Sequence, residues 1–591
     1  MSQRWAFSWR EARAVLAHVV LVLLALELIY LVVANSVLRS SAIKHAVAGA
    51  QGMHLEYGSA FSWLPGRAHV EDLSLRIEDY NVQFLLKIER AEVDVGLDEL
   101  LHKRFHAFRV RADGVSFLMR HKVQQAEGHG ERLAAFPKIA GFADPPLFVG
   151  PEPPPIPDDQ YDLWQVHLED VVAHAKELWI LEYRFRGDAE ARGAFLVRPA
   201  RLVQVGPARL ELRSGSLSLG PHAVARSVKG SLSVSVPNLQ VPKVEGIAVL
   251  REISAQADVQ LGRGDLDFID AYRDPGGPSV RGTAAWSIHA RLQRGVVQPG
   301  TSLKGDATTM EVTIPGKDRP NLVVAGPLEV SAAVTEASPQ QLSLATGAAA
   351  LVLRRVENGK PSGVPSPTIE QASLTAALQP ADLSQDLRIV SLRSRVARAH
   401  VPNLYWFQPW LSPDDSLRVD GVGNASFEAA CDEQQLCQVE RARVDVVGAR
   451  LGLGDRASEP VSGSFDAESV LLPWHEKKLA GQARLEVSSA RALLPLVTSL
   501  PVKDAIASAL GLAQVRARFA LSGSSADYRI RLLEARSGGL SARGNYRRQQ
   551  KREHGVLLLS TQAVNVGVTL KDGDSDVSLL VGDDWLTRQP E

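Results

Sequence analysis

The chain is short of the residues that define several common protein classes. Its 591 residues include two cysteines, which excludes a disulfide-rich scaffold and an all-cysteine zinc site. Sixty-six Lys and Arg nearly balance 67 Asp and Glu, so overall charge does not favour nucleic acid as a partner. After residue 34, no apolar run is long enough to span a bilayer, which excludes a polytopic membrane protein. The hydrophobic content of 45% excludes bulk disorder.

Catalytic signatures are also missing. The sequence has no G-x-S-x-G elbow, no Walker A loop and no H-E-x-x-H motif. Gly421-Val-Gly423 lacks the third glycine and the strand–helix context of a dinucleotide loop, and Trp474-His-Glu476 offers one base without a spaced partner. We therefore expect no catalytic residues, no metal ligands and no cofactor, and predict that the chain is not an enzyme.

The one strongly apolar segment is residues 14–34, where 18 of 21 positions are Leu, Val, Ile or Ala. A helix of about 20 residues spans a bilayer core. Glu27 near its centre costs roughly 3 kcal/mol, which the fourteen Leu, Val and Ile residues, at roughly −0.4 kcal/mol each, outweigh. A cleaved signal peptide is the alternative, but its apolar core would be shorter.

Basic residues set the predicted orientation of this anchor. Arg4, Arg10 and Arg13 precede the apolar segment, a positive-inside bias that places the N-terminus in the cytoplasm. We predict a single-pass bacterial inner-membrane protein with the bulk of the chain in the periplasm. The ionisable His18 and Glu27 within the segment have two interpretations, a functional pair or an anchor that tolerates one protonated carboxyl.

Beyond the anchor, apolar and polar residues alternate, which is typical of half-buried strands. Leu73, Leu75 and Ile77 alternate with Ser74, Arg76 and Glu78. Val93 and Val95 alternate with Glu92 and Asp94, and similar runs recur to the C-terminus. Short turn sequences separate the runs. Helical patterns are few, chiefly at 35–51 and 490–510. The body is predicted to be mainly β and antiparallel.

Composition changes suggest five parts. They are an N-terminal transmembrane anchor at 1–36, a small β unit at 37–143, a proline-rich linker at 144–159, a middle β-rich region at 160–390 and a C-terminal β-rich region with helical lid segments at 391–591. The linker holds seven prolines in Pro145–Pro157, which indicates a stiff spacer.

Two local features have open alternatives. Cys431 and Cys437 enclose five residues between two alternating runs, so a hairpin disulfide is predicted for an oxidising compartment, with two separate thiols as the alternative. The aromatic residues Tyr405, Trp406, Phe407 and Trp410 form either a buried plug between sheet segments or a lid that touches lipid.

The order of elements in the first 122 residues resembles the AsmA-like superfamily of bacterial envelope proteins, the AsmA, TamB and YhdP type. The residues that carry the resemblance are a helix ending at Gly52, the strand His54–Phe61, the Pro65-Gly66 turn, Val70–Leu75, Ala91–Val95 leading into Leu97–Leu101, and Val115–Leu118 with Arg120. The segments from Asn403 to Gly421 and from Ala490 to Gly523 are similar to the family's later units. The middle matches only in strand character, and the chain is much shorter than the longest members.

The resemblance implies an elongated, curled antiparallel sheet that forms a β-groove behind one transmembrane helix. It implies a role in outer-membrane biogenesis, in which the groove shields or transfers phospholipid, with phospholipids and outer-membrane assembly proteins as partners. The groove-facing candidates are Leu73, Leu75, Ile77, Val93, Val95 and Phe117. In closed β-sandwiches these residues would instead pack against each other. The alternative function is a structural or assembly factor of the cell envelope that carries no lipid.

Overall fold

The computed structural model describes most of the chain. The described residues are 9–40, 43–44, 52–124, 130–150, 157, 163–199, 201–240, 246–274, 276–317, 319–334, 340–379, 381–383, 385, 388–411, 417–434, 436–453, 456–473, 478–489, 491–493, 514–524, 527–549, 552–572 and 574–589. Most of the helix predicted at 490–510 lies outside these residues, and the described part is the short 3-10 helix η5 (Arg491–Leu493).

The apolar N-terminal segment forms one helix, α1 (Trp9–Arg39). Its stretch Leu16–Arg39 is long and apolar enough to cross a membrane. The sequence analysis allowed this helix to continue to residue 51. It ends at Arg39, residues 43–44 are helical again, and residues 45–51 lie outside the described part of the chain.

The chain divides into two compact units. Unit 1 comprises Met1–Tyr272, Ala285–Leu303 and Asp382–Gln385, and unit 2 comprises Arg273–Ala284, Lys304–Ala381 and Asp386–Glu591. The division runs through two strands, β12 (Ser279–Gln293) and β14 (Ser302–Ile314). The five predicted parts stay a prediction, because a division by spatial contact does not test boundaries drawn from composition.

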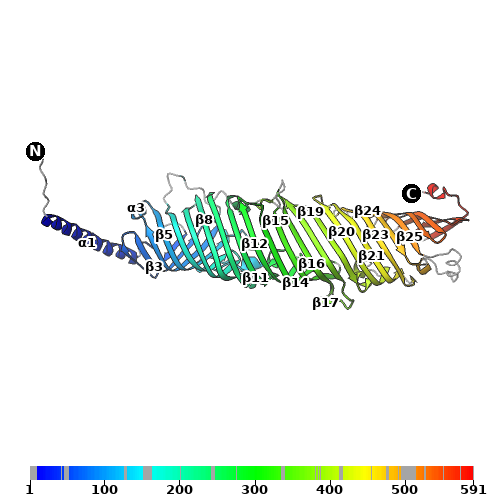
Figure 1. The fold of residues 1–591 in the computed structure, drawn as a ribbon, viewed down its shortest axis with the longest axis horizontal. Helices are drawn as coiled ribbons and strands as arrows, with labels where there is room; N and C mark the ends of the chain where they lie inside the picture. The colour runs from blue at the N-terminus through cyan, green and yellow to red at the C-terminus, as the bar shows by residue number, and fades with distance from the viewer. Residues whose placement is uncertain are drawn as a thin grey trace. The chain divides into compact units, whose positions relative to one another are not determined.

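In unit 1, α1 is followed by the first strands of an open sheet (Figure 1). The strands of unit 1 are β1 (Met53–Glu56), β2 (Ser59–Leu64), β3 (Arg67–Glu78), β4 (Val82–Val95), β5 (Arg104–His121), β6 (Gln165–Ile180), β7 (Tyr183–Arg198), β8 (Leu202–Leu219), β9 (His222–Ala225), β10 (Val228–Gln240), β11 (Ser254–Asp265) and β13 (Val296–Val297). Its short helices are α3 (Leu97–Leu100), α4 (Gly130–Ala134), η2 (Gly246–Glu252) and η3 (Asp267–Tyr272). β1 and β2 share one edge because both pair with β3.

One strand pair departs from the predicted antiparallel pattern. β5 and β6 run parallel, from Arg104↔Gln165 to Met119↔Ile180. Parallel neighbours need a connection of a dozen or more residues that crosses back to the starting end. The segment between β5 and β6, which contains the proline-rich linker, provides that crossover.

The described part of this crossover lies against the sheet rather than standing free as a spacer. Val123 donates its amide hydrogen to Pro146 and accepts one from Phe148. The buried Arg120 on β5 donates to the carbonyls of Pro137 and Ala143 at 3.0 and 2.7 Å and to the Asp144 carboxylate at 2.9 Å. One guanidinium therefore ties three points of the crossover to the sheet.

Unit 2 holds the later strands of the same open sheet, whose labelled strands lie side by side in chain order in Figure 1. The strands are β15 (Asn321–Val334), β16 (Leu342–Glu357), β17 (Lys360–Pro361), β18 (Thr368–Gln379), β19 (Arg388–Val401), β20 (Leu417–Asp432), β21 (Leu436–Leu453), β22 (Arg456–Ala457), β23 (Val461–Pro473), β24 (Lys478–Val487), β25 (Val515–Ser524), β26 (Asp527–Ser537), β27 (Leu540–Gln549), β28 (Arg552–Ser560), β29 (Asn565–Lys571) and β30 (Asp574–Leu579). The remaining helices are η4 (Leu404–Phe407), α5 (Gln408–Leu411), η5 and η6 (Trp585–Arg588).

The predicted fold class is confirmed: the chain is mainly β, antiparallel in all but one described pair, with few short helices after one apolar helix. The strands belong to one sheet, and among the described strands no pairing joins the first strand of either unit to its last, so the sheet stays open.

Local breaks in the strand alternation change the face of the sheet on which the following side chains lie. On β5, Ala112 and Val115 are both buried in one apolar cluster although they are three residues apart. Strict alternation would place them on opposite faces. Gly114 lies between them with φ +68°, a conformation that suits glycine, and a side chain there would collide with Glu89. The interruption therefore keeps one face of the sheet apolar on both sides of the bend.

Candidate functional site

In unit 1, one row of directly paired residues is apolar across eight strands. Residues that face each other in neighbouring strands lie on the same face of a sheet. The row runs Leu55, Leu75, Leu86, Phe117, Leu178, Phe185, Leu217 and Ala225. Five of these, Leu86, Leu178, Phe185, Leu217 and Ala225, belong to one apolar cluster of the unit.

The six predicted groove residues lie on this apolar face. Leu75 and Phe117 are members of the row, and Leu73 and Ile77 pair with the apolar Ile88 and Phe84. Val93 pairs with Val110, and Val95 pairs with Ala107. All six are half-buried. Their contact with lipid stays a prediction.

Unit 2 carries an equivalent row over thirteen strands. It runs Ala348, Ala372, Val396, Phe427, Ala442, Ala467, Ala483, Phe519, Leu532, Gly544, Leu557, Val568 and Val577. Phe427 is 41% exposed and Leu374, on the same face of β18, is 39% exposed. Large apolar side chains in the middle of this face are therefore uncovered.

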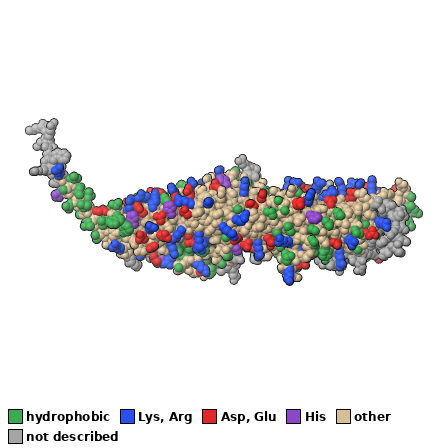
Figure 2. All heavy atoms as spheres, turned by 60° about the horizontal axis from the view of Figure 1, so that its bottom comes forward, with side chains coloured by type: hydrophobic (Ala, Val, Ile, Leu, Met, Phe, Trp, Pro, Cys, Tyr) green, Lys and Arg blue, Asp and Glu red, His purple; other side chains and the backbone are tan. Residues whose placement is uncertain are grey.

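The opposite face of unit 2 is polar. The residues next to the row pair as Ser373, Arg395, Glu428 and Arg441 on β18 to β21. Arg443 bonds Asp445 on the same face, which raises the pKa of its guanidinium. In the view of Figure 2, Lys and Arg side chains are interspersed with Asp and Glu, and hydrophobic side chains are densest along α1. The strands of unit 2 thus present apolar side chains on one face of the sheet and polar side chains on the other.

Short helices cover the ends of the apolar face in unit 2. Leu404 and Trp406 of η4 are buried, and Leu404 packs over Gly423, where a side chain would leave no room for it. Trp406 stacks on Trp410 at 5.1 Å, and the buried Arg355 donates to its carbonyl at 2.9 Å. The aromatic cluster therefore forms a buried plug at the strand ends, while Tyr405 is exposed.

The two cysteines form a disulfide across the β20–β21 hairpin. Cys431 and Cys437 are direct register partners, and their other partners are Leu392 and Leu472. The link closes the hairpin at the end where the two strands join.

Replacing both cysteines by serine is expected to destabilise unit 2 modestly. Opening so short a loop costs about 2 kcal/mol in the chain-entropy model. Denaturant unfolding of the full chain in detergent would measure the difference. Dithiothreitol should lower the stability of the unmodified chain by the same amount and leave the double variant unchanged. A dithiothreitol effect of equal size on the variant would contradict a role for the disulfide.

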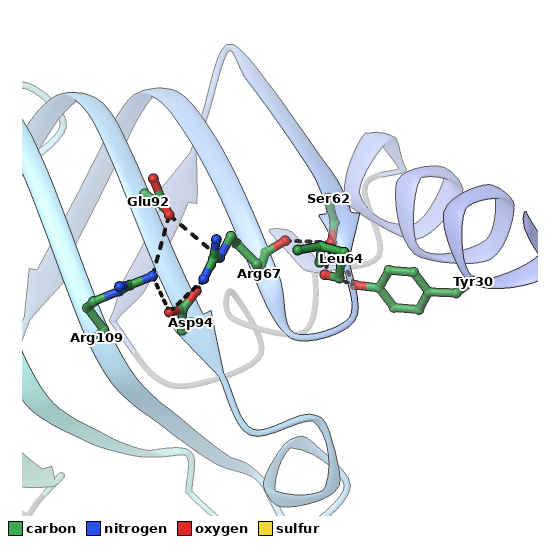
Figure 3. Close-up of polar contacts among 7 residues, drawn as sticks. All are labelled: Tyr30, Ser62, Leu64, Arg67, Glu92, Asp94 and Arg109. Carbon is green, nitrogen blue, oxygen red and sulfur yellow. Dashed lines mark hydrogen bonds and ion pairs between the residues drawn. The ribbon is translucent and has the colours of Figure 1, made fainter. Parts of the chain in front are cut away.

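The edge of unit 1 is hydrogen-bonded to α1 (Figure 3). Asn35 accepts a hydrogen bond from the Ser62 amide at 2.8 Å and donates to the Ser62 carbonyl at 2.9 Å, so its side chain acts like a neighbouring strand for β2. The Tyr30 hydroxyl shares a hydrogen bond with Ser62 Oγ at 2.6 Å and donates to the Leu64 carbonyl at 3.2 Å. The apolar helix is therefore joined directly to the first strands of the sheet.

Charged residues form a network across the neighbouring strands β3, β4 and β5. Arg67 donates to Asp94 at 2.8 Å, and Arg109 pairs with Asp94 at 2.7 Å (Figure 3). The hydrogen bond from Arg67 holds the pKa of the Asp94 carboxyl below its usual value, while burial opposes the shift. A lowered acid pKa gives stability above about pH 4 that is lost as the pH falls through the folded-state value.

One cluster of metal-ligand type escaped the sequence analysis. His106, His167 and Glu169 have ligand atoms within 4.8 Å of one another. His106 and His167 are 61 positions apart and meet only through the parallel β5–β6 register, which no local pattern reveals. His106 Nε2 lies 2.8 Å from Glu169, and the two imidazole rings stack. We interpret the cluster as a hydrogen-bonded His106–Glu169 pair with His167 stacked on it.

These features define the class of the protein as an open β-sheet protein with one apolar and one polar face, joined at its edge to a helix able to cross a membrane. No protein-family model matches the chain, and no curated protein matches its sequence.

Proposed function

We propose that this chain is an inner-membrane-anchored periplasmic protein of outer-membrane biogenesis that holds phospholipid acyl chains on the apolar face of its sheet in each unit. The observation that carries the proposal is the unbroken apolar row in each unit, with Leu374 and Phe427 uncovered in unit 2. An apolar face of this extent rarely stays exposed to water. Acyl chains that cover it gain about 0.8 kcal/mol for each buried CH₂ group.

Three further observations favour lipid as the occupant. The sheet edge of unit 1 is hydrogen-bonded to α1, so an anchored α1 brings the apolar face to a bilayer surface. The polar opposite face keeps the sheet soluble while the apolar face is occupied. The element order of the first 122 residues resembles the AsmA-like superfamily, in which such sheets are thought to shield lipid.

We propose no catalytic role, because lipid shielding needs only apolar surface. The site is expected to act by binding alone. The acyl chains leave water for the apolar face of the sheet, and the headgroup stays in solvent at the edge of that face.

Photo-crosslinking of the full chain in cells would test this proposal. A benzophenone amino acid at Phe117 in unit 1 or Phe427 in unit 2 should form adducts with phospholipid, identified by mass spectrometry. The matched control is Ser426, one residue along β20 on the opposite face and paired with Arg443. It should form none.

Two outcomes would overturn the proposal. Adducts with protein only, at positions 117 and 427, would favour the assembly factor that carries no lipid. Equal lipid adducts at 426 and 427 would show that contact with lipid is not confined to the apolar face.

A further inference from the structure

A second apolar surface lies at the membrane edge of unit 1, and the lipid-carrying rows do not include it. It comprises Trp63 and Leu64 at the end of β2 with Leu97 and Leu101 around α3, and is called the rim below. We propose that the rim inserts into the leaflet from which the C-terminal end of α1 emerges, so that unit 1 touches the membrane at two places. This inference does not depend on lipid carriage.

The direction of β2 follows from its hydrogen bonds to α1. Ser62 is bonded to Asn35 and to Tyr30, and Leu64, two residues further on, is bonded to Tyr30, five residues earlier in the helix than Asn35. As β2 proceeds from 62 to 64, it therefore runs back along α1 toward the apolar segment.

The depth of the rim follows from the position of Tyr30. The apolar run ends at Ala34, and the Tyr30 hydroxyl lies beside that end, because it bonds Ser62, which Asn35 also holds. The Leu64 carbonyl is 3.2 Å from the Tyr30 hydroxyl and shares its depth. When α1 spans a bilayer, Leu64 therefore lies near the boundary between headgroups and acyl chains.

The exposed side chains at this end suit that depth. Leu101 is 85% exposed, Trp63 65%, Leu64 53% and Leu97 46%. The Val95 amide donates to the Gly66 carbonyl at 2.6 Å, which places α3 beside the β2–β3 turn. Tryptophan is enriched at membrane interfaces, because its ring has an apolar body and a polar N–H.

Backbone amide and carbonyl groups at this depth also have hydrogen-bond partners. β2 is an edge strand, and an open strand edge is not tolerated in hydrocarbon. Asn35 occupies both the amide and the carbonyl of Ser62, and Tyr30 occupies the carbonyl of Leu64. The charged groups at the rim are Arg67 and, within α3, Asp98 and Glu99. Arg67 is paired with Asp94, and Glu99 with Arg104. Continuity with the apolar helix favours a lipid leaflet over a protein partner as the occupant.

Depth-dependent quenching of a fluorescent label would test the inference. Because Cys431 and Cys437 are joined, a single introduced cysteine can be labelled selectively with an environment-sensitive dye. The full chain carrying Leu64→Cys or Leu101→Cys would be reconstituted into phosphatidylcholine vesicles that contain a lipid with a doxyl quencher on its acyl chain. Leu24→Cys in α1 reports whether the helix is inserted.

The matched control is Val149→Cys, which is 82% exposed in the same unit. Its neighbour Phe148 packs against Tyr80 at 5.0 Å, at the opposite ends of β3 and β4 from the rim. We expect loss of fluorescence at positions 24, 64 and 101 and none at 149. Quenching at 24 without quenching at 64 and 101 would overturn the inference. Equal access of aqueous iodide to 64, 101 and 149 would do the same, and crosslinks from the rim to another protein would identify a different occupant.

Discussion

Phe427→Asp is expected to reduce the phospholipid bound to unit 2 by more than tenfold. Phe427 lies between Val396 and Ala442 in the apolar row, and a carboxylate at its position would have to lose its water when an acyl chain covered it. Desolvating an unpaired carboxylate costs several kcal/mol, and 1.4 kcal/mol already corresponds to tenfold in affinity. Lipid per chain, measured by mass spectrometry of the extracted full-length protein, gives the effect.

The fold should survive this change, because Phe427 is 41% exposed and the new carboxylate can face water when no lipid is bound. Ser426→Asp is the matched control, since it adds the same charge one residue away on the polar face, opposite Arg443. We expect it to leave bound lipid unchanged. Equal lipid retention by both variants, with both chains folded, would count against carriage on this face.

Arg120→Leu is expected to cost about 3–5 kcal/mol and to release the crossover between β5 and β6. Arg120 is fully buried and donates to Gln83, Pro137, Ala143 and Asp144. Its removal leaves the Gln83, Pro137 and Ala143 oxygens without their donor, at roughly 1–3 kcal/mol for each acceptor that stays buried, whereas the 42% exposed Asp144 carboxylate can regain water. Leucine supplies none of the lost hydrogen bonds.

Hydrogen exchange would locate this effect. The amides of Val123 and Phe148 are bonded within the crossover and should be protected in the unmodified chain and exchange rapidly in the variant. Lys138→Leu is the control, because Lys138 is exposed and lies 3.9 Å from the same Asp144. Surface pairs of this kind contribute about 0–1 kcal/mol. Unchanged protection of Val123 and Phe148 in Arg120→Leu would show that the crossover is held by other contacts.

The local order of apolar and polar residues was enough to predict much of the fold. The apolar run at 14–34 specified α1, since a helix of that length and composition depends on no partner. Period-two alternation located most strands, because a strand with one dry and one wet face must alternate. It also identified Leu75 and Phe117 as apolar-face residues, although they are 42 positions apart and meet only through Leu86 on β4.

Alternation could not follow the apolar face across a bend. At Gly114 the side-chain order shifts, so that Ala112 and Val115 share a face. A single glycine permits the shift, and in the sequence it cannot be distinguished from a glycine in a turn. The same limit applies at Gly421, which lies within β20 at a register shift that the sequence does not reveal.

Tertiary structure alone decided how segments far apart in the chain meet. The parallel β5–β6 pair, the burial of Arg120 under the crossover and the meeting of His106 with His167 all depend on where a long connection returns to the sheet. The bonds of Asn35 and Tyr30 to β2 depend on the edge of the sheet being placed beside the helix. Sequence patterns record each strand's preference for water or for apolar surroundings. The contacts that join one element to another come from the packing of the whole unit.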